Sequence, residues 1–348
     1  MLASLFMTKD DFYSNRYAGI QALRGIAAMI VILEHVRFLA CGAFGVDIFF
    51  CISGFMIMLT TQNNTRHFFK KRLIRILPLY YIMTLATWIG LLIVPSLFQS
   101  TQADVSCLIK SLLCIPFDMG QGSIRPLMGV GWTINCEMFF YLIFFIAMKI
   151  HHKYRGLLCT VFLLILMGIA SLPIGNDSIL LQFYGNPVML EFGLGIGCFY
   201  VSRWMYEKYH QSSISKSLPI LLGLLVCGMF LVLLLTKHAL YHDDFNRFIY
   251  WGIPAFVLVL IFFFLGMFIS FPGWLVHLGD MSFSIYLIHY YPVIVFDRLF
   301  FDFGLCSLKS VFGLFFVIGI VLILSEISYR LIEKRLSTFL KKLWIQTP

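Results

Sequence analysis

The chain of 348 residues is 60% hydrophobic and only 12% charged. Together with a mean hydropathy of +0.89, this excludes an ordinary soluble protein and predicts an all-α integral membrane protein. The net charge of +9 requires no nucleic-acid partner, because membrane topology alone can account for it. The nine cysteines are scattered without zinc-ligand spacing or a CxxC motif, so the sequence predicts no metal site and no disulfide framework.

Apolar runs long enough to span the hydrocarbon core of a bilayer recur along the whole chain. They predict about ten transmembrane helices in a single membrane domain over residues 1–348, without a cleaved signal peptide or an appended soluble domain. In chain order, the predicted helices cover residues 18–37, 43–61, 77–98, 131–149, 156–174, 183–202, 218–236, 248–270, 281–300 and 309–329.

The distribution of Lys and Arg between the loops predicts how these helices are oriented. Nineteen of the 26 fall on the side that carries both termini, and seven fall on the other side. Because cytoplasmic loops are enriched in Lys and Arg, we expect both termini in the cytoplasm of a multi-pass protein of the cytoplasmic (inner) membrane. The longest outward loop, residues 98–130, contains Cys107 and Cys114, which could form a disulfide or remain two free thiols.

The first predicted helix carries ionisable groups inside an apolar segment. Arg24, Glu34 and His35 lie in the stretch IQALRGIAAMIVILEH, and a charge at the centre of a bilayer costs roughly 2.5–3.5 kcal/mol on insertion scales. Arg24 and His35 are eleven residues apart, close to three helical turns, so they share one face at a separation of about 16 Å. This pattern predicts a functional helix with a cation near one membrane surface and an imidazole near the other.

The second predicted helix has Asp47 near its outer end, followed by Ser53 and Gly54. Because Asp47 follows His35 after a short turn, its carboxylate could orient and stabilise that imidazole. An interfacial role at the helix end is the alternative interpretation of Asp47. Ser53 and Gly54 are also typical of close helix packing through small residues.

The strongest positive charge density lies in KKRLIRILPLYY, which begins at Lys70. Arg72 and Arg75 are three residues apart, so they are neighbours on one helical face. Two guanidinium groups there form a fork suited to phosphate groups such as those of coenzyme A. The same segment is also typical of the positively charged cytoplasmic flank of a membrane helix.

Polar side chains recur in the fourth predicted helix, which opens GWTINCEMFFYL. Thr133, Glu137 and Tyr141 are spaced by four residues and form a polar stripe, with Trp132 at the expected membrane interface. Because a buried carboxylate needs a partner, Glu137 is a candidate for glycan binding or proton handling.

Two late segments carry further ionisable groups. In MSFSIYLIHYY, His289 shares a face with Ser282 and Tyr286. A histidine among aromatic residues is more often a packing residue, so His289 is a candidate for substrate contact rather than for catalysis. Glu326 lies four residues before Arg330, a spacing that predicts an ion pair on one helix face.

Three of these motifs together resemble those of the acyltransferase-3 family, whose members are integral-membrane enzymes that acylate surface glycans. They are the Arg24 to His35 spacing, the stretch GVDIFFCISGFMI from Gly45, and the basic segment from Lys70. The similarity is greatest to members acting on exopolysaccharide and covers about residues 18–336. It implies a membrane-bound O-acyltransferase that moves an acyl group, with acetyl the simplest expectation, from acyl-CoA to a hydroxyl of a polysaccharide or lipid-linked glycan.

The chemistry of acyl transfer and the resemblance together suggest a role for each candidate residue. His35 is the expected general base, because the ordinary pKa of imidazole, about 6.5, suits a base at neutral pH. The other expected catalytic residues are Arg24, Asp47 and Glu137. The expected acetyl-CoA ligands are Arg72, Arg75 and Ser53, and the expected acceptor contacts are Trp132, Tyr141 and His289.

Two other classes of function are compatible with the same residues. A polytopic transporter or channel would also place Glu, His and Arg in membrane helices, and a membrane scaffold for glycan assembly is a third possibility. No internal repeat of the kind common in transporters is visible. The sequence leaves open the acyl group, the sugar, the oligomeric state, and the choice between direct transfer and an acyl-histidine relay.

Overall fold

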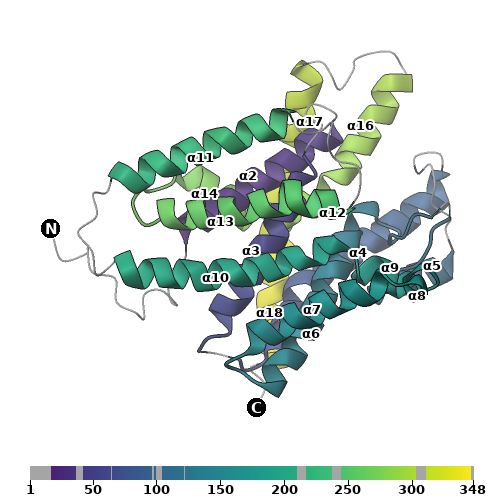
Figure 1. Ribbon diagram of the computed structural model, residues 1–348. Coiled ribbons are helices and arrows are strands. Elements are labelled where there is room, and N and C mark those ends of the chain that lie inside the picture. Colours follow the sequence, from purple (N-terminus) through teal and green to yellow (C-terminus); the bar gives the residue numbers. More distant parts are fainter. Residues whose placement is uncertain are drawn as a thin grey trace.

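A computed structural model gives the fold of this chain, and all its regular secondary structure within the described residues is helical (Figure 1). This confirms the all-α prediction. The structure describes residues 17–36, 42–63, 65–95, 98, 104–120, 122–209, 217–236, 244–302 and 311–345.

The described helices follow one another with short connections. In the first part of the chain they are α2 (Ala18–His35), α3 (Phe44–Thr60), α4 (Phe68–Ile93), α5 (Val105–Leu112), η2 (Gly129–Gly131), α6 (Trp132–Ile150), α7 (Arg155–Ala170), α8 (Pro173–Asn176), α9 (Ile179–Tyr184), η3 (Pro187–Met189) and α10 (Leu190–Tyr209). In the second part they are α11 (Ser217–Thr236), α12 (Asp244–Arg247), the π-helical turn η5 (Phe248–Gly252), α13 (Ile253–Leu265), α14 (Gly273–Asp280), α15 (Ser282–Ile288), α16 (Tyr290–Asp302), α17 (Val311–Ser328), the π-helical η6 (Tyr329–Leu336) and α18 (Ser337–Ile345).

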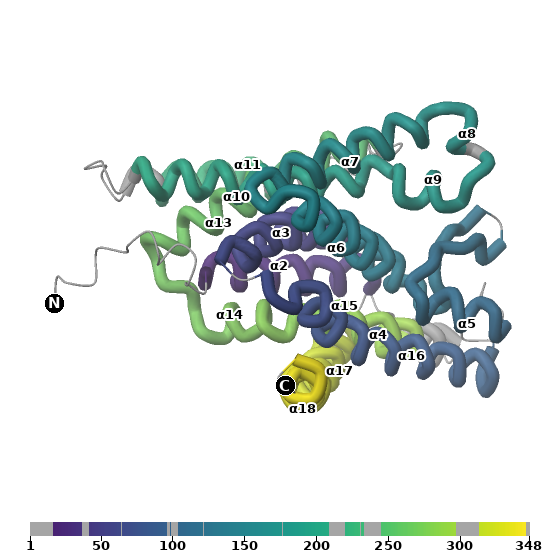
Figure 2. The backbone as a smooth tube through the Cα atoms, turned by 90° about the horizontal axis from the view of Figure 1, so that it is seen from below, coloured from purple at the N-terminus to yellow at the C-terminus, as the bar shows by residue number. Residues whose placement is uncertain are grey.

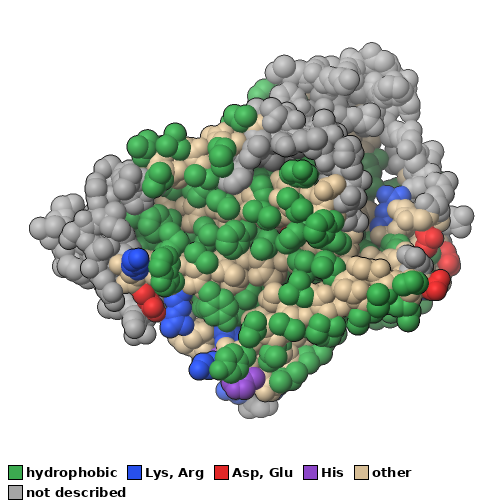
Figure 3. All heavy atoms as spheres, in the orientation of Figure 1, with side chains coloured by type: hydrophobic (Ala, Val, Ile, Leu, Met, Phe, Trp, Pro, Cys, Tyr) green, Lys and Arg blue, Asp and Glu red, His purple; other side chains and the backbone are tan. Residues whose placement is uncertain are grey.

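The helices are those of a multi-pass membrane protein. A helix lies at each of the ten predicted positions, but only five described segments are long and apolar enough to cross a bilayer by themselves. In the surface view of Figure 3, hydrophobic side chains cover most of the described face, and Lys and Arg gather at its lower left. The five segments are Ala18–His35, Phe68–Ile93, Gly129–Ile150, Phe245–Leu265 and Gly313–Ile345.

Several helix boundaries differ from the prediction. α4 begins at Phe68, well before the predicted residue 77, because lysine and arginine are good helix formers and the basic segment continues the helix. The predicted helix over 248–270 instead has a π-helical turn at its start and ends at Leu265. The predicted loop 98–130 contains α5, which starts where the Asp104 carboxylate accepts the Ser106 backbone N–H at 3.1 Å.

α2 and α3 lie at the centre of the molecule, with α7, α10 and α11 on one side and α14, α17 and α18 on the other (Figure 2). Glycine allows α3 and α10 to approach closely: a Cβ atom at Gly54 of α3 would lie 2.1 Å from the Phe192 carbonyl oxygen of α10. A Cβ atom at Gly195 of α10 would lie equally close to the Cys51 carbonyl oxygen of α3. The structure therefore confirms the predicted close packing at Gly54.

Near the end of the chain, the expected ion pair is present. The Arg330 guanidinium donates to the Glu326 carboxylate at 2.5 Å, and His277 of α14 lies 2.7 Å from the other carboxylate oxygen. Glu326 of α17 thereby contacts both α14 and η6, the helical segment that follows α17.

Candidate functional site

A narrow cavity of about 70 Å³, here called the inner chamber, lies among α2, α3, α4, α6 and α15. Its apolar walls include Phe49, Phe50 and Phe283. The polar side chains that line it include Arg24, Ser53, Arg72, Arg75, Glu137 and Tyr141. The chamber thus brings together residues that the sequence predicted for catalysis, donor binding and acceptor contact.

Glu137 is the carboxylate of the inner chamber, and its contacts are specific. It accepts a hydrogen bond from the Ser53 hydroxyl at 3.0 Å and a second one from the Tyr141 hydroxyl. Because Tyr141 lies one turn further along α6, the predicted polar stripe does face a single cavity. Ser53 lines the chamber while its neighbour Gly54 packs against α10, so close helix packing applies to Gly54, and donor binding by Ser53 stays a prediction.

Arg72 joins the chamber wall to two other helices. Its Nη2 donates to the Thr60 hydroxyl at 2.7 Å at the end of α3. Its guanidinium also lies over the Tyr141 and Phe68 rings, 5.2 and 5.7 Å from their centroids. Arg72 is therefore held by a hydrogen bond and by stacking as well as by charge.

A wider cavity of about 640 Å³, here called the vestibule, adjoins the inner chamber. The two cavities share Arg24, Arg72 and Arg75 in their walls. The vestibule also has Lys71 and, from the last helix, Lys341, so five cationic side chains face it. This arrangement attracts a ligand with several negative charges.

Two carboxylates in the vestibule wall, Asp280 and Glu333, were not among the predicted site residues. The Glu333 carboxylate accepts from the Ser284 backbone N–H at 3.0 Å and from its hydroxyl at 2.5 Å. Glu333 thereby ties η6 to α15 and fixes the last part of the chain as one wall. The sequence offered no signal for this role, because Glu333 lies among basic residues of an apparently exposed tail.

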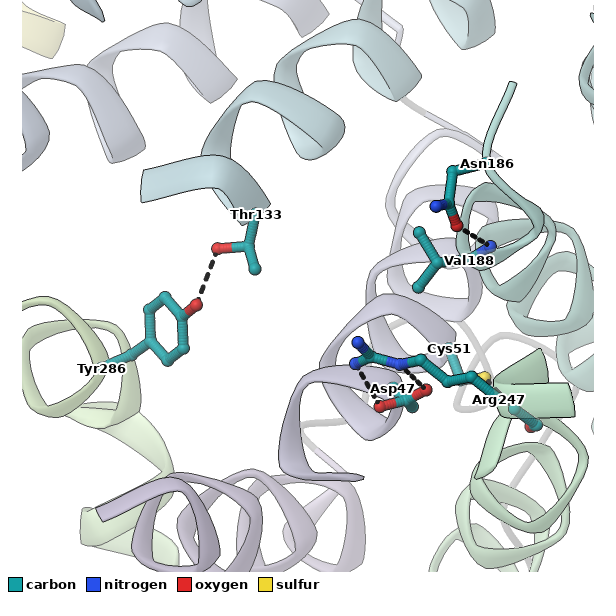
Figure 4. Close-up of polar contacts among 8 residues, drawn as sticks. Asp47, Cys51, Thr133, Asn186, Val188, Arg247 and Tyr286 are labelled. Carbon is teal, nitrogen blue, oxygen red and sulfur yellow. Dashed lines mark hydrogen bonds and ion pairs between the residues drawn. The ribbon is translucent and has the colours of Figure 1, made fainter. Parts of the chain in front are cut away.

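Asp47 belongs to a different part of the structure, here called the outer cluster, with Arg247, Trp132 and Trp251. Figure 4 shows its ion pair of Asp47 and Arg247. Arg247 donates to both Asp47 oxygens, through Nε at 3.1 Å and Nη2 at 2.8 Å. The guanidinium lies over the Trp132 and Trp251 rings at 5.7 and 5.4 Å. Asp47 is fully buried and Arg247 is 12% exposed, so this is a desolvated, bidentate ion pair.

The expected contact of Asp47 with His35 is therefore replaced by an ion pair with Arg247. The two residues are 200 positions apart in the chain. A guanidinium satisfies both carboxylate oxygens at once, which a single imidazole nitrogen cannot do. Trp132, a predicted acceptor contact, lies against Arg247 and against the Phe50 ring at 6.0 Å.

His35 and His289 form a pair. Their ring centroids are 4.7 Å apart, and His35 Nδ1 lies 2.9 Å from the Val31 carbonyl oxygen. His289 lies between the end of α15 and the start of α16 and is fully buried. Its Nε2 has no hydrogen-bond partner among the described residues. Neither histidine is among the described residues that line the inner chamber, although Arg24 of the same helix as His35 is.

The segment between α4 and α6 contains the two cysteines whose state the sequence left open. Cys107 and Cys114 are both free thiols in the structure. Burial raises the pKa of Cys114 to about 12, so this thiol resists ionisation at neutral pH. Among the residues that the structure describes, no group of three or more His, Cys, Asp or Glu is arranged to hold a metal ion.

Comparison with known proteins identifies the family. The model of the family described as "Acyltransferase domain", the acyltransferase-3 family, matches residues 17–329. The chain belongs to this family. It is therefore an acyltransferase, as the resemblance of its motifs predicted. No solved structure matches the chain.

Three relatives illustrate the similarity. The exopolysaccharide production protein ExoZ of Rhizobium meliloti is 28% identical over 288 residues, which are 78% of this chain and 83% of ExoZ. YrhL of Bacillus subtilis, whose name assigns it to peptidoglycan O-acetylation, is 30% identical over 92% of this chain and 55% of its own length. The O-acetyltransferase OatA of Staphylococcus aureus is 27% identical over 94% of this chain and 58% of its own length. The chain thus spans most of ExoZ but little more than half of YrhL and OatA.

Proposed function

We propose that this chain is a membrane-bound O-acetyltransferase that moves an acetyl group from acetyl-CoA to a hydroxyl of a cell-surface or exported polysaccharide, or of its lipid-linked precursor. The names of OatA and YrhL support the O-acetyl group, and the name of ExoZ supports an exopolysaccharide acceptor. The observation that carries the proposal is that the wide, basic vestibule adjoins the narrower inner chamber and that the same three arginines line both cavities.

The two cavities match the two ends of acetyl-CoA. Its nucleotide end carries a pyrophosphate and a 3′-phosphate, which suit a wide cavity faced by five cationic side chains. Its thioester lies at the end of a thin pantetheine arm, which suits the narrow chamber. Arg72 and Arg75 would hold phosphate, Arg24 would lie along the path of the arm, and Ser53 would contact the arm near Glu137.

In the proposed reaction, the acceptor hydroxyl attacks the thioester carbonyl carbon and the tetrahedral intermediate collapses with loss of the coenzyme A thiolate. His35 takes the proton of the hydroxyl as general base, and the thiolate leaves with a proton from solvent or the imidazolium. Cationic Arg24, three turns from His35 on α2, holds the donor on its way from the vestibule so that the thioester is placed for this attack. Glu137 and Tyr141, which are hydrogen-bonded to each other, hold the reacting groups. His289 packs against His35 and contacts the acceptor. Asp47 fixes the outer cluster, where the acceptor arrives.

We further propose ten membrane spans in one domain, with both termini in the cytoplasm and the protein in the inner membrane. The excess of Lys and Arg on one side supports this orientation. The separation of Arg72 and the vestibule from Asp47 and the outer cluster also supports it, because donor and acceptor then approach from opposite faces.

Purified protein supplied with radiolabelled acetyl-CoA and a de-O-acetylated surface glycan as acceptor tests the proposal. We expect release of coenzyme A thiol, and we expect cells that lack the gene to lose O-acetyl groups from their surface glycans by mass spectrometry. The variant His35→Ala should be made in equal amount and inserted into the membrane but should transfer no acetyl group. A protein that releases no thiol and leaves the glycans unchanged would contradict the function, whereas an active His35→Ala variant would contradict only the choice of base.

A further inference from the structure

One aromatic side chain, Tyr286 of α15, connects the inner chamber to the histidine pair that contains the proposed general base. Tyr286 lines the inner chamber, and its ring lies 5.8 Å from the His289 imidazole. His289 in turn contacts His35 at 4.7 Å between ring centroids. A thioester in the chamber would therefore have to pass Tyr286 before an acceptor activated by His35 could reach it.

The Tyr286 hydroxyl is fixed by a triangle of polar groups. It donates to the Val130 carbonyl oxygen at 3.0 Å, and the Thr133 hydroxyl lies 3.0 Å from it and 3.1 Å from the same carbonyl. Figure 4 shows the Thr133 and Tyr286 side chains pointing toward one another from α6 and α15. Both side chains are buried, at 6% and 7% exposure, and both line the inner chamber, so the triangle forms part of its wall.

The hydrogen bonds of this triangle can be exchanged for others, so the closure is reversible. The triangle has two hydroxyl protons for three contacts, so the Thr133 hydroxyl can donate to only one of its two neighbours at a time. A hydroxyl of an incoming sugar can replace the Thr133 hydroxyl beside Tyr286 at little net cost, because one neutral hydrogen bond is exchanged for another. The Phe49 ring, 6.1 Å from the Tyr286 ring, supports the closed position from the other side.

We propose that Tyr286 is a positioning residue that closes the inner chamber toward the His35 and His289 pair, and that an acceptor hydroxyl opens it by taking the place of Thr133. This inference rests on the proposed function. Its chemical consequence is protection of the donor: while the chamber is closed, water cannot attack the thioester carbonyl and release acetate and coenzyme A. Tyr286 thus determines whether the acetyl group goes to the glycan or to water.

The test compares thioester hydrolysis with acetyl transfer in the full-length chain. Purified enzyme is given acetyl-CoA alone, and thiol release without acceptor is measured, while surface-glycan O-acetylation is measured in cells. We expect Tyr286→Phe and Thr133→Val each to raise acceptor-independent hydrolysis roughly two- to tenfold, the range that one lost hydrogen bond implies, and to lower glycan acetylation. Because they break the same triangle, the double variant should hydrolyse acetyl-CoA little faster than either single variant.

Tyr291→Phe is a matched control. The Tyr291 hydroxyl also contacts a threonine, Thr87, and donates to the Met83 carbonyl oxygen at 2.9 Å, but Tyr291 does not line the inner chamber. It should leave the ratio of hydrolysis to transfer unchanged. Tyr286→Phe that leaves this ratio at the wild-type value, or that lowers hydrolysis and transfer in parallel, would overturn the inference. Wild-type enzyme that transfers no acetyl group to glycan, with the surface glycans unchanged in cells that lack the gene, would instead overturn the proposed function, and the role of Tyr286 with it.

Discussion

At Arg72, a substitution can separate the effect of the positive charge from the effect of the planar guanidinium group. Its guanidinium donates to Thr60 and lies over the Tyr141 and Phe68 rings, while it faces both cavities. A lysine would keep the positive charge but could neither stack on these rings as a plane nor bind phosphate with a fork. A positively charged flank of a membrane helix requires only the charge, so the two interpretations of this segment predict different results.

We expect Arg72→Lys to raise the KM for acetyl-CoA about tenfold or more, because a hydrogen bond to a charged group contributes roughly 1.5–3 kcal/mol. Steady-state kinetics of purified variants measures this change. Arg203→Lys is the control, since Arg203 forms an exposed ion pair with Glu207 on α10 and lines neither cavity. Equal KM values for wild type and Arg72→Lys would leave Arg72 with a topological role only.

The buried pair of Asp47 and Arg247 leads to a prediction about stability. Asp47→Asn removes the charge that compensates a guanidinium 12% exposed, and breaking a buried pair in this way costs about 3–5 kcal/mol. Thermal unfolding in detergent should therefore show a large fall in Tm. Glu207→Gln, which breaks the exposed pair with Arg203, should cost below about 1 kcal/mol and shift Tm little. Similar shifts for the two variants would mean that the outer cluster does not stabilise the fold.

At the scale of helices, the sequence predicted where helices lie along the chain but not which residues of different helices contact one another. Hydrophobic runs predicted the all-helical fold because a membrane helix satisfies its own backbone hydrogen bonds, so its signal is local, but only five described segments are long and apolar enough to span a bilayer. α14 was missed because its eight residues are too short for a span, and the break at His289 divides one predicted helix into α15 and α16. The pairing of Asp47 with Arg247 depends on tertiary packing, which periodicity in the sequence does not report.

In the candidate site, too, contacts within one helix could be predicted and contacts between distant segments could not. The four-residue spacing predicted that Glu137 and Tyr141 share a face, and both line the inner chamber with Arg72 and Arg75. The contribution of α18 and η6 to the vestibule could not be predicted, because their residues follow the last apolar run and resemble a solvated basic tail. Their place in the wall depends on contacts such as that of the Ser337 hydroxyl, which donates to the Ile74 carbonyl oxygen at 3.2 Å.

α18 supplies the next prediction, since Lys341 faces the vestibule and its neighbour Lys342 does not line it. We expect Lys341→Ala to weaken acetyl-CoA binding and to reduce the preference for acetyl-CoA over acetyl-dephospho-CoA, which lacks the 3′-phosphate. The ratio of kcat/KM for the two donors measures this preference. Lys342→Ala keeps α18 and changes the net charge equally, so it should behave as wild type. If both variants keep the wild-type ratio, the last helix does not contact that phosphate.

For the whole molecule, the separation of the vestibule from the outer cluster predicts sidedness. Arg24 lines the vestibule and His35 lies three turns further along α2, about 16 Å by helical rise. In sealed vesicles of known orientation, acetyl-CoA should be used only from the face with both termini, and acetylated glycan should be accessible to an esterase added on the opposite face. Donor use and product on the same face would show that the acceptor enters from the cytoplasm.

The sharing of Arg24, Arg72 and Arg75 by the two cavities also bears on turnover. If these side chains bind the nucleotide of acetyl-CoA, most of the binding energy comes from a part of the donor that the reaction leaves intact. Contacts to the nucleotide are the same before and after the reaction, so they bind acetyl-CoA and free coenzyme A equally well. Free coenzyme A would then compete with acetyl-CoA for the same arginines, so the rate of glycan acetylation would follow the ratio of the two in the cytoplasm and decline as the acetyl supply of the cell runs down.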